Sequence, residues 1–130
     1  MLKSDQLCEL GRAVIETEAA AISQLTSRID DKFSQACEMI LNCTGRLIVI
    51  GMGKSGHIGK KIAATLASTG TPAFFVHPGE ASHGDMGMII ANDLVLALSN
   101  SGNTAEINNL LPLIKRLDVP LISLTGNPQS

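Results

Sequence analysis

The sequence predicts an α/β fold in which helices cover both faces of a parallel β-sheet. Four continuous apolar runs, each suited to one buried strand, lie at residues 47–50, 73–76, 94–98 and 121–124. Segments with apolar residues at helical spacing separate the first two runs and the last two. Continuous apolar strands that alternate with helices are typical of a sheet buried on both sides. The pattern predicts a three-layer α/β/α sandwich with a parallel, flavodoxin-like sheet, preceded by N-terminal helices.

The composition indicates one globular domain with a small-molecule partner. The 130 residues are 45% hydrophobic and 17% charged, which suits a compact core and is not typical of a disordered chain. The formal net charge is -2 and there is no basic stripe, so the electrostatic pattern of a nucleic-acid-binding protein is missing.

The sequence shows no pattern of secretion or membrane insertion. Its apolar runs stay short of the roughly 20 residues that a membrane helix needs, and the first residues lack the apolar block of a signal peptide. Cys8, Cys37 and Cys43 are odd in number and form no CxxC pair, which favours free thiols over disulfides or a zinc site. We therefore expect a cytoplasmic protein without a membrane partner.

Two helices are predicted within the first 43 residues. Apolar residues recur there at helical spacing between charged ones, at Leu7, Val14, Ile15, Ala19, Ile22, Leu25 and Ile29. Asp30 or Asp31 can cap the second helix at its start, and the polar stretch 42–45 ends it.

The strand at 47–50 leads into the sequence GMGKSG at residues 51–56, here called the glycine turn, and a helix is predicted at 58–68. The pattern GxGxxG between a strand and a helix is found in dinucleotide sites. The next strand, at 73–76, is followed by His77, where such a site has the acidic residue that binds the ribose. A nucleotide-binding Rossmann domain stays open as an alternative.

The glycine turn is not a Walker A loop either, because Ile48 stands where the first glycine of that motif belongs. The turn instead brings the Lys54 ammonium and the Ser55 hydroxyl to the carboxyl edge of the sheet, where parallel sheets bind ligands. The alternative is that Lys54 is solvated and the glycines only allow the helix to pack closely on the strand.

An irregular stretch at residues 77–86, here called the histidine segment, carries two imidazoles and two carboxylates, those of His77, Glu80, His83 and Asp85. Such groups can open a sugar ring, move protons or bind a metal. His83 and Asp85 alone are too few to define a metal site. The alternative is that these side chains are solvated or hydrogen-bonded in the loop.

The strand at 94–98 is followed by SNSGNT at residues 99–104, here called the serine loop, and a helix is predicted at 103–117. Hydroxyls and glycine-exposed backbone N–H groups at a helix start suit a phosphate. Glu106 then lies close to the bound anion, which points to proton transfer. Alternatively, Asn103 caps the helix and Glu106 completes a capping box.

No helix follows the last strand, at 121–124, before the turn-like residues 127–130. That strand would remain as an apolar edge, which proteins usually cover. We therefore expect either a shortened chain or a partner at this edge.

The motifs resemble those of a known family. Ser99-x-Ser101-Gly102-x-Thr104 is similar to the signature of sugar isomerase (SIS) domains. The glycine turn with His57, together with the histidine segment, narrows the resemblance to the D-arabinose-5-phosphate isomerases. The resemblance covers nearly the whole chain and implies a single SIS domain over residues 1–130.

The resemblance implies an enzyme that interconverts D-ribulose 5-phosphate and D-arabinose 5-phosphate through an enediol, the first step of Kdo biosynthesis for lipopolysaccharide or capsule. By motif position, Lys54 and Glu106 match catalytic residues, with Glu106 as the base. The implied substrate contacts are Ser55, Gly70, Thr71, His77, His83, Ser99, Ser101 and Thr104. His83 also matches a metal-binding histidine, where a divalent ion such as zinc would inhibit turnover, and no cofactor is implied to be required.

Members of this family continue past the position of Ser130 with further strand and helix, a second glutamate and a histidine, and many add a pair of CBS domains. We therefore expect that the SIS domain is truncated at its C-terminus and that the CBS pair is absent. The resemblance also implies a homo-oligomer, a dimer or tetramer. The alternative function is a non-catalytic phosphosugar-binding SIS module of a regulator.

Overall fold

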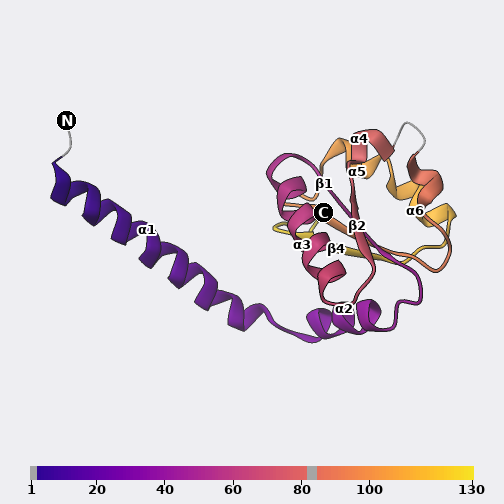
Figure 1. Cartoon of the computed structure of the whole chain (residues 1–130), viewed down its shortest axis with the longest axis horizontal. Coiled ribbons are helices and arrows are strands. Elements are labelled where there is room, and N and C mark those ends of the chain that lie inside the picture. The colour runs from indigo at the N-terminus through magenta and orange to yellow at the C-terminus, as the bar shows by residue number, and fades with distance from the viewer. Residues whose placement is uncertain (1–2, 82–84) are drawn as a thin grey trace. The chain divides into compact units, whose positions relative to one another are not determined.

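The computed structural model describes residues 3–81 and 85–130, with the side chains of residues 85 and 86 left out. The chain divides between Gln35 and Ala36 into two compact units. The first contains α1 (Ser4–Gln24), the 3-10 turn η1 (Leu25–Arg28) and the start of α2 (Asp31–Leu41) (Figure 1). The second contains the rest of α2 and the whole sheet.

The two predicted N-terminal helices are confirmed. In α1, no described residue is buried within the structure. Asp30 supplies the cap of α2, because its Oδ1 accepts hydrogen bonds from the backbone N–H of Lys32 at 3.0 Å and of Phe33 at 3.2 Å. Such a cap satisfies donors that have no partner within the helix.

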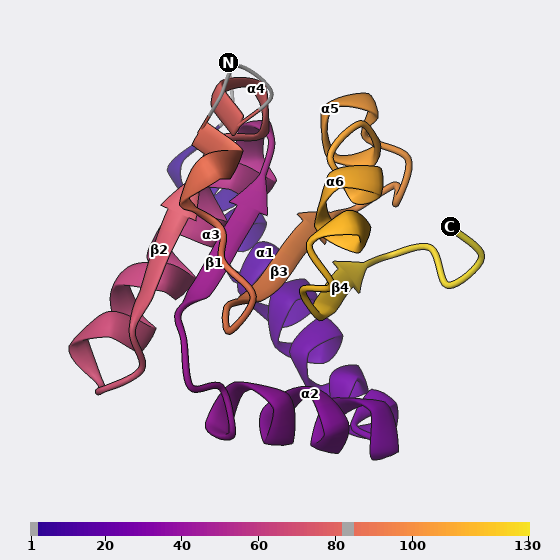
Figure 2. The ribbon, with the colours of Figure 1, turned by 90° about the vertical axis from the view of Figure 1, so that its right-hand side faces the viewer.

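The sheet is parallel throughout, with the strand order β2-β1-β3-β4 (Figure 2). The strands are β1 (Leu47–Gly51), β2 (Ala73–Val76), β3 (Leu94–Ser99) and β4 (Leu121–Thr125). This order agrees with the first four strands of a flavodoxin-like sheet, so the predicted topology is confirmed. The order reverses direction between β1 and β3, and the carboxyl ends of these two strands form the switch point of the fold.

Helices cover both faces of the sheet, as predicted. Alternate residues of β1 face opposite sides: Leu47 and Val49 pack on the side of α3 (Gly53–Ser68), whereas Ile48 and Ile50 pack on the other side. That second side is covered by α5 (Ala105–Asn108) and α6 (Leu111–Arg116). All five residues of β1 are buried, which explains its unbroken apolar sequence.

Two element boundaries differ from the prediction. Helix α3 begins at Gly53, earlier than the expected residue 58, so Lys54 and Ser55 lie in its first turn. The helix predicted at 103–117 is divided into α5 and α6. Pro112 explains the division, because it has no N–H to donate to the carbonyl four residues before it and is tolerated only in a first helical turn.

The histidine segment has some regular structure where it is described. A short helix, α4 (Pro78–Ala81), follows β2, and a 3-10 turn, η2 (Asp85–Met88), precedes β3. Pro78 and Ala81 are buried, so the beginning of the segment is fixed to the core. None of the described helices is long and apolar enough to cross a membrane.

An ion pair at the amino edge of the sheet joins the residues that precede β1 and β3. Arg46 Nη2 lies 2.8 Å from Asp93 Oδ2, and the Asp93 side chain has no exposed surface. Its Oδ1 also accepts the backbone N–H of Arg46 at 2.9 Å, and its Oδ2 accepts that of Ile90 at 3.0 Å. Burial by itself would raise the pKa of Asp93, but the hydrogen bonds from Arg46 and Ile90 outweigh burial and hold the pKa below its ordinary value.

Candidate functional site

The glycine turn and the serine loop meet at the switch point of the sheet. The end of β1 pairs with β3, with Gly51 opposite Leu98, so the segments that follow both strands leave the sheet side by side. They line a cavity of about 290 Å³, here called the switch-point cavity. Its lining residues are Lys54, Ser55, Ile58, Leu98, Ser99, Asn100, Leu124, Thr125 and Gly126. The predicted convergence of Lys54, Ser55 and Ser99 at the carboxyl edge is therefore present in the structure.

Gly56 of the glycine turn and Gly59 of α3 also have a packing role. A Cβ built on Gly56 would lie 2.8 Å from the Gly51 carbonyl oxygen, and one on Gly59 would lie 3.1 Å from a Val49 methyl carbon. These positions allow α3 to pack closely against β1. The packing role is confirmed, and this packing of α3 places Lys54 at the switch-point cavity. That Lys54 contacts a ligand stays a prediction.

The serine loop is shaped by its own hydroxyl groups. Ser99 Oγ accepts the backbone N–H of Gly102 at 3.0 Å and lies 2.8 Å from Thr104 Oγ1, with which it forms a hydrogen bond. Ser101 Oγ accepts the N–H of Asn103 at 3.1 Å. Gly102 has a φ of 71°, a conformation that favours glycine. The loop is therefore formed before any ligand binds.

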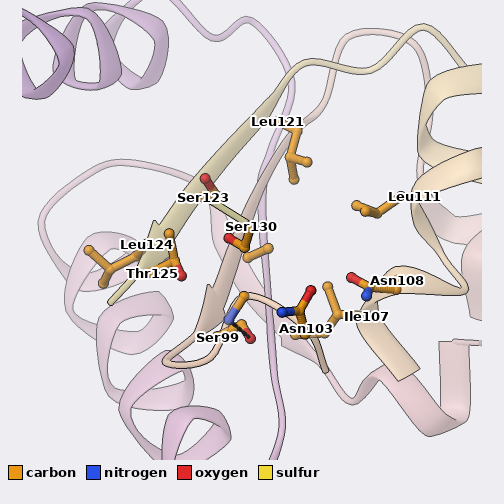
Figure 3. Close-up of a pocket in the computed structure, with 12 residues that line it drawn as sticks. Ser99, Asn103, Ile107, Asn108, Leu111, Leu121, Ser123, Leu124, Thr125 and Ser130 are labelled. Atoms are coloured by element: carbon orange, nitrogen blue, oxygen red, sulfur yellow. Dashed lines mark hydrogen bonds between the residues drawn. The ribbon is translucent and has the colours of Figure 1, made fainter. Parts of the chain in front are cut away.

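A second cavity, of about 390 Å³, lies between β4 and helices α5 and α6 (Figure 3). We call it the β4 cavity. Ser99 and Asn103 lie at one end of it, and Leu111 and Leu121 lie at the other. Ser99, Leu124 and Thr125 line both cavities, so these three residues lie between them. The β4 cavity therefore has a polar end, at Ser99 and Asn103, and an apolar end, at Leu111 and Leu121.

Glu106 lies in the first turn of α5 and is exposed. The alternative in which Asn103 caps the helix is wrong, since Thr104 occupies the cap position and no side-chain cap bond forms. Glu106 is thus the second helical residue, not the third that a capping box needs. Within the described part of the chain its carboxylate has no hydrogen bond or ion pair and lines neither cavity.

His77 follows β2 at the same edge of the sheet. Its Nδ1 accepts the backbone N–H of Gly79 at 3.1 Å, which leaves Nε2 to face other groups. His77 lines a small cavity of about 150 Å³ together with His57 and Lys60, next to the glycine turn. This side chain is therefore near the first turn of α3, on the side away from the serine loop.

The predicted roles of His83 and Asp85 fall outside what the structure describes. The described residues do not include His83, and the side chain of Asp85 is left out. Across residues 3–81 and 85–130, no group of three or more His, Cys, Asp or Glu side chains is placed to hold a metal ion. The metal site predicted at His83 stays a prediction, and no chemical step below depends on it.

Gly70 and Thr71 lie apart from the other predicted contacts, and their role in substrate binding stays a prediction. They lie at the amino edge of the sheet, where α3 ends and β2 begins, whereas Lys54 and Ser99 lie at the carboxyl edge. The N–H of Thr71 donates to the Leu66 carbonyl at 2.9 Å, and Gly70 has a φ of 100°. This is the hydrogen-bond pattern of a Schellman cap, so the local sequence is explained by the need to end α3. The structure does not bring these two residues to the cavities.

Six lining residues of the switch-point cavity are not among the predicted site residues: Ile58, Leu98, Asn100, Leu124, Thr125 and Gly126. A signal was available, because Thr125 and Gly126 follow directly on an apolar run in a parallel sheet, at the edge where ligands bind. The order of the strands, which places β4 next to β3, was needed to interpret that signal.

Comparison with known proteins gives consistent results. The chain is 69% identical over 116 residues to the arabinose 5-phosphate isomerase KdsD of Pseudomonas aeruginosa, covering 89% of the chain and 36% of that protein. It is 54% identical over 122 residues to the protein of the same name from Escherichia coli K12, covering 94% of the chain and 37% of that protein. The chain thus spans little more than a third of the length of these curated relatives.

A solved structure from E. coli CFT073, in complex with arabinose 5-phosphate, superimposes with a TM-score of 0.94 at 41% identity, covering 99% of this chain and 69% of that one. The sequence model of the SIS domain matches residues 40–130, which include the sheet, the glycine turn and the serine loop. The chain therefore belongs to the SIS domain family.

Proposed function

We propose that this protein is an aldose–ketose isomerase that interconverts D-arabinose 5-phosphate and D-ribulose 5-phosphate. The observation that carries the proposal is that Lys54 and Ser55 line the switch-point cavity together with Ser99 and Asn100 of the serine loop. The 69% identity to an arabinose 5-phosphate isomerase supports this choice of substrate among sugar phosphates. The reaction would supply the precursor of Kdo, as a cytoplasmic step.

The phosphate is assigned to the serine loop. Its hydroxyls and backbone N–H groups are numerous and close together, and an anion gains most from donors that are already held in place. Binding at a group remote from the reacting carbons can position the sugar for the chemical step. We therefore expect that arabinose without phosphate is a poor substrate.

The chemical step transfers one proton between neighbouring carbons. A base removes the C2 proton of the open-chain aldose, the electron pair of that bond forms the C1–C2 double bond of an enediolate, and the proton is returned to C1. The O2 proton moves to O1, so that the carbonyl ends on C2. We assign the base to Glu106 and the stabilisation of the developing oxyanion to Lys54. His77, with a ring nitrogen available, is the described candidate for opening the sugar ring.

Because Glu106 is exposed and lines neither cavity, its carboxylate must move toward the sugar when the substrate binds. The carboxylate belongs to a one-turn helix that follows the preformed serine loop directly, so a small shift of this helix or a change of the Glu106 side-chain conformation can bring it toward the sugar. Catalytic contacts often tighten only in the complex with substrate.

The test is an assay of ketose formation from D-arabinose 5-phosphate, with exchange of the C2 proton followed in deuterium oxide. Glu106→Gln is expected to lower kcat by about 10²–10⁴-fold, the range for loss of a general base. Glu38→Gln, on the exposed face of α2, is the matched control and should keep full activity. Wild-type binding of the sugar phosphate without any exchange would instead favour a non-catalytic phosphosugar-binding module.

The catalytic scheme uses no cofactor. A chelator added to the purified protein is expected to leave turnover undiminished or to raise it, because a divalent ion at His83 is assigned an inhibitory role. Loss of activity with the chelator, restored by zinc, would reverse that assignment.

We also propose a homo-oligomer. Helix α1 exposes large apolar side chains that a water-facing helix would not normally carry together, with Leu7, Leu10, Val14, Ile15 and Ile22 each 55–69% exposed. A second copy of the chain would cover them. Light scattering should give the mass of a dimer or tetramer, and Ile15→Lys combined with Ile22→Lys should lower it.

A further inference from the structure

The turn that follows β4 lies against the serine loop. In the pairing of β3 with β4, Ser99 is opposite Thr125, so both chains leave the sheet together. The residues after this point, Thr125, Gly126 and Asn127, have no role in the chemistry proposed above. Gly126 and Asn127 nevertheless form hydrogen bonds with the serine loop.

Two hydrogen bonds join this turn to the serine loop. The N–H of Gly126 donates to the Asn100 carbonyl oxygen at 3.1 Å. The side-chain Nδ2 of Asn127 lies 3.4 Å from the Ser101 carbonyl oxygen. The turn is itself held by Thr125, whose Oγ1 accepts the Asn127 N–H at 3.1 Å. The consecutive carbonyl groups of Asn100 and Ser101 are therefore both bound by the 125–127 turn.

The contact is close enough to require glycine on each side. A Cβ on Gly126 would lie 3.0 Å from the Asn100 carbonyl oxygen and 2.8 Å from Asn100 Oδ1. A Cβ on Gly102 would meet the Ser130 side chain first and would also lie 3.0 Å from Thr125 Oγ1. Because a backbone oxygen cannot move away as a flexible side chain can, a larger residue at position 126 must displace the loop.

The direction of one N–H group follows from this geometry. The peptide plane between Asn100 and Ser101 is trans, so its C=O and N–H point in opposite directions. The C=O is held by Gly126, and the Ser101 N–H is therefore directed away from the turn. Among the residues that the structure describes, none accepts a hydrogen bond from the Ser101 N–H.

We infer that the 125–127 turn is a positioning element that holds the Ser101 N–H in the direction in which it donates to the phosphate of the substrate. The inference rests on the proposed function, in which the serine loop holds that phosphate. Gly126 and Asn127 act through Asn100 and Ser101 and need not touch the sugar. Their effect should therefore fall on binding and not on the chemical step.

The first experiment compares Gly126→Ala with Gly87→Ala, a matched control at which a Cβ would meet no atom within 4 Å. Gly126→Ala is expected to raise the KM for D-arabinose 5-phosphate about tenfold, the effect of losing one well-placed hydrogen bond to a charged group, with kcat within about twofold of wild type. Calorimetric titration with inorganic phosphate should show the same loss. Gly87→Ala should change neither value.

A second pair of variants covers the case in which Gly126→Ala fails to fold. Thr125→Val removes the acceptor for the Asn127 N–H and keeps the shape of the side chain, whereas Thr125→Ser restores the acceptor. The KM should rise in the first variant and return toward wild type in the second. A purely structural role would lower the melting temperature without separating KM from kcat.

The possible failures are distinguishable. If the wild-type protein binds neither D-arabinose 5-phosphate nor inorganic phosphate, the proposed function fails. If the wild type binds both, and Gly126→Ala and Thr125→Val bind them equally well, the positioning role of the turn is refuted while the proposed function stands.

Discussion

At the scale of single residues, Ser99 differs from the other hydroxyls of the serine loop. Its side chain is nearly buried and bonds both to the Gly102 N–H and to Thr104 Oγ1, whereas the side chain of the exposed Ser101 bonds only to the Asn103 N–H. Ser99 therefore maintains the shape of the loop in addition to any contact with phosphate.

Ser99→Ala is expected to destabilise the protein by about 0.5–1.5 kcal/mol, because it removes the hydrogen bonds of Ser99 Oγ with the Gly102 N–H and with Thr104, while the Ser99 carbonyl oxygen still accepts that N–H at 3.2 Å. Ser101→Ala is the matched control and should cost less, since water can replace its hydroxyl at the surface. Urea unfolding followed by circular dichroism measures both. Equal destabilisation by the two substitutions would contradict the structural role of Ser99.

The residue types of the site could be predicted from the sequence more reliably than their local roles. Lys54, Ser55 and Ser99 could be placed at one edge because each follows a buried parallel strand. The cap residue of α5 could not be predicted in this way. Asn103 and Thr104 are both suitable cap residues, and the choice between them depends on how Gly102 turns the chain. The expected role of Gly70 and Thr71 rests on motif position alone, which does not reveal at which edge of the sheet a residue lies.

At the scale of elements, the strands were predicted closely and the helices less so. The two central strands, β1 and β3, are buried along their whole length, and burial leaves an unbroken apolar run that marks where each one lies. Helix boundaries depend on local competition. The glycines at the start of α3 are poor helix formers, and the helix nevertheless begins at Gly53 because packing on β1 stabilises it.

The cap of α3 allows a direct test of how a helix end is specified. A Cβ on Gly70 would meet no atom within 4 Å, so the only cost of Gly70→Ala is the strain of an L-residue at a φ of 100°. We expect a loss of about 1–2 kcal/mol in the free energy of unfolding. Gly70→Asn is the control, because asparagine tolerates positive φ better and should cost less. Calorimetric melting of both variants measures the difference, and an alanine variant as stable as wild type would rule out the strain.

At the scale of the whole molecule, the sheet order brings distant segments together in ways that local patterns do not encode. The placement of β3 beside β1 produces the switch-point cavity, and the placement of β4 beside β3 brings the 125–127 turn to the serine loop. The same order brings Arg46 to Asp93 at the opposite edge. No spacing rule connects these two residues, so the ion pair could not be predicted from the sequence.

The Arg46–Asp93 pair should make folding depend on pH. The pKa of Asp93 in the folded protein lies below its ordinary value of 3.8, so the unfolded chain takes up this proton first as pH falls. The contribution of the pair to stability is complete above the unfolded pKa and is lost as pH falls through the folded pKa. Asp93→Asn keeps the shape of the side chain and cannot titrate. Its free energy of unfolding should be lower than that of wild type at neutral pH, by about 1–3 kcal/mol.

Urea unfolding midpoints of wild type and Asp93→Asn, measured from about pH 7 down to about pH 3, test this dependence. The other carboxylates are the same in both proteins, so their effect on stability cancels when the two free energies of unfolding are subtracted. The gap between wild type and Asp93→Asn should be constant near neutral pH and should narrow below about pH 4. Asp118→Asn, an exchange of the same kind at a residue outside the ion pair, is the matched control and should show no such narrowing. A gap that stays constant to the lowest pH would mean that the stability lost in Asp93→Asn comes from packing and not from the charge of the carboxylate.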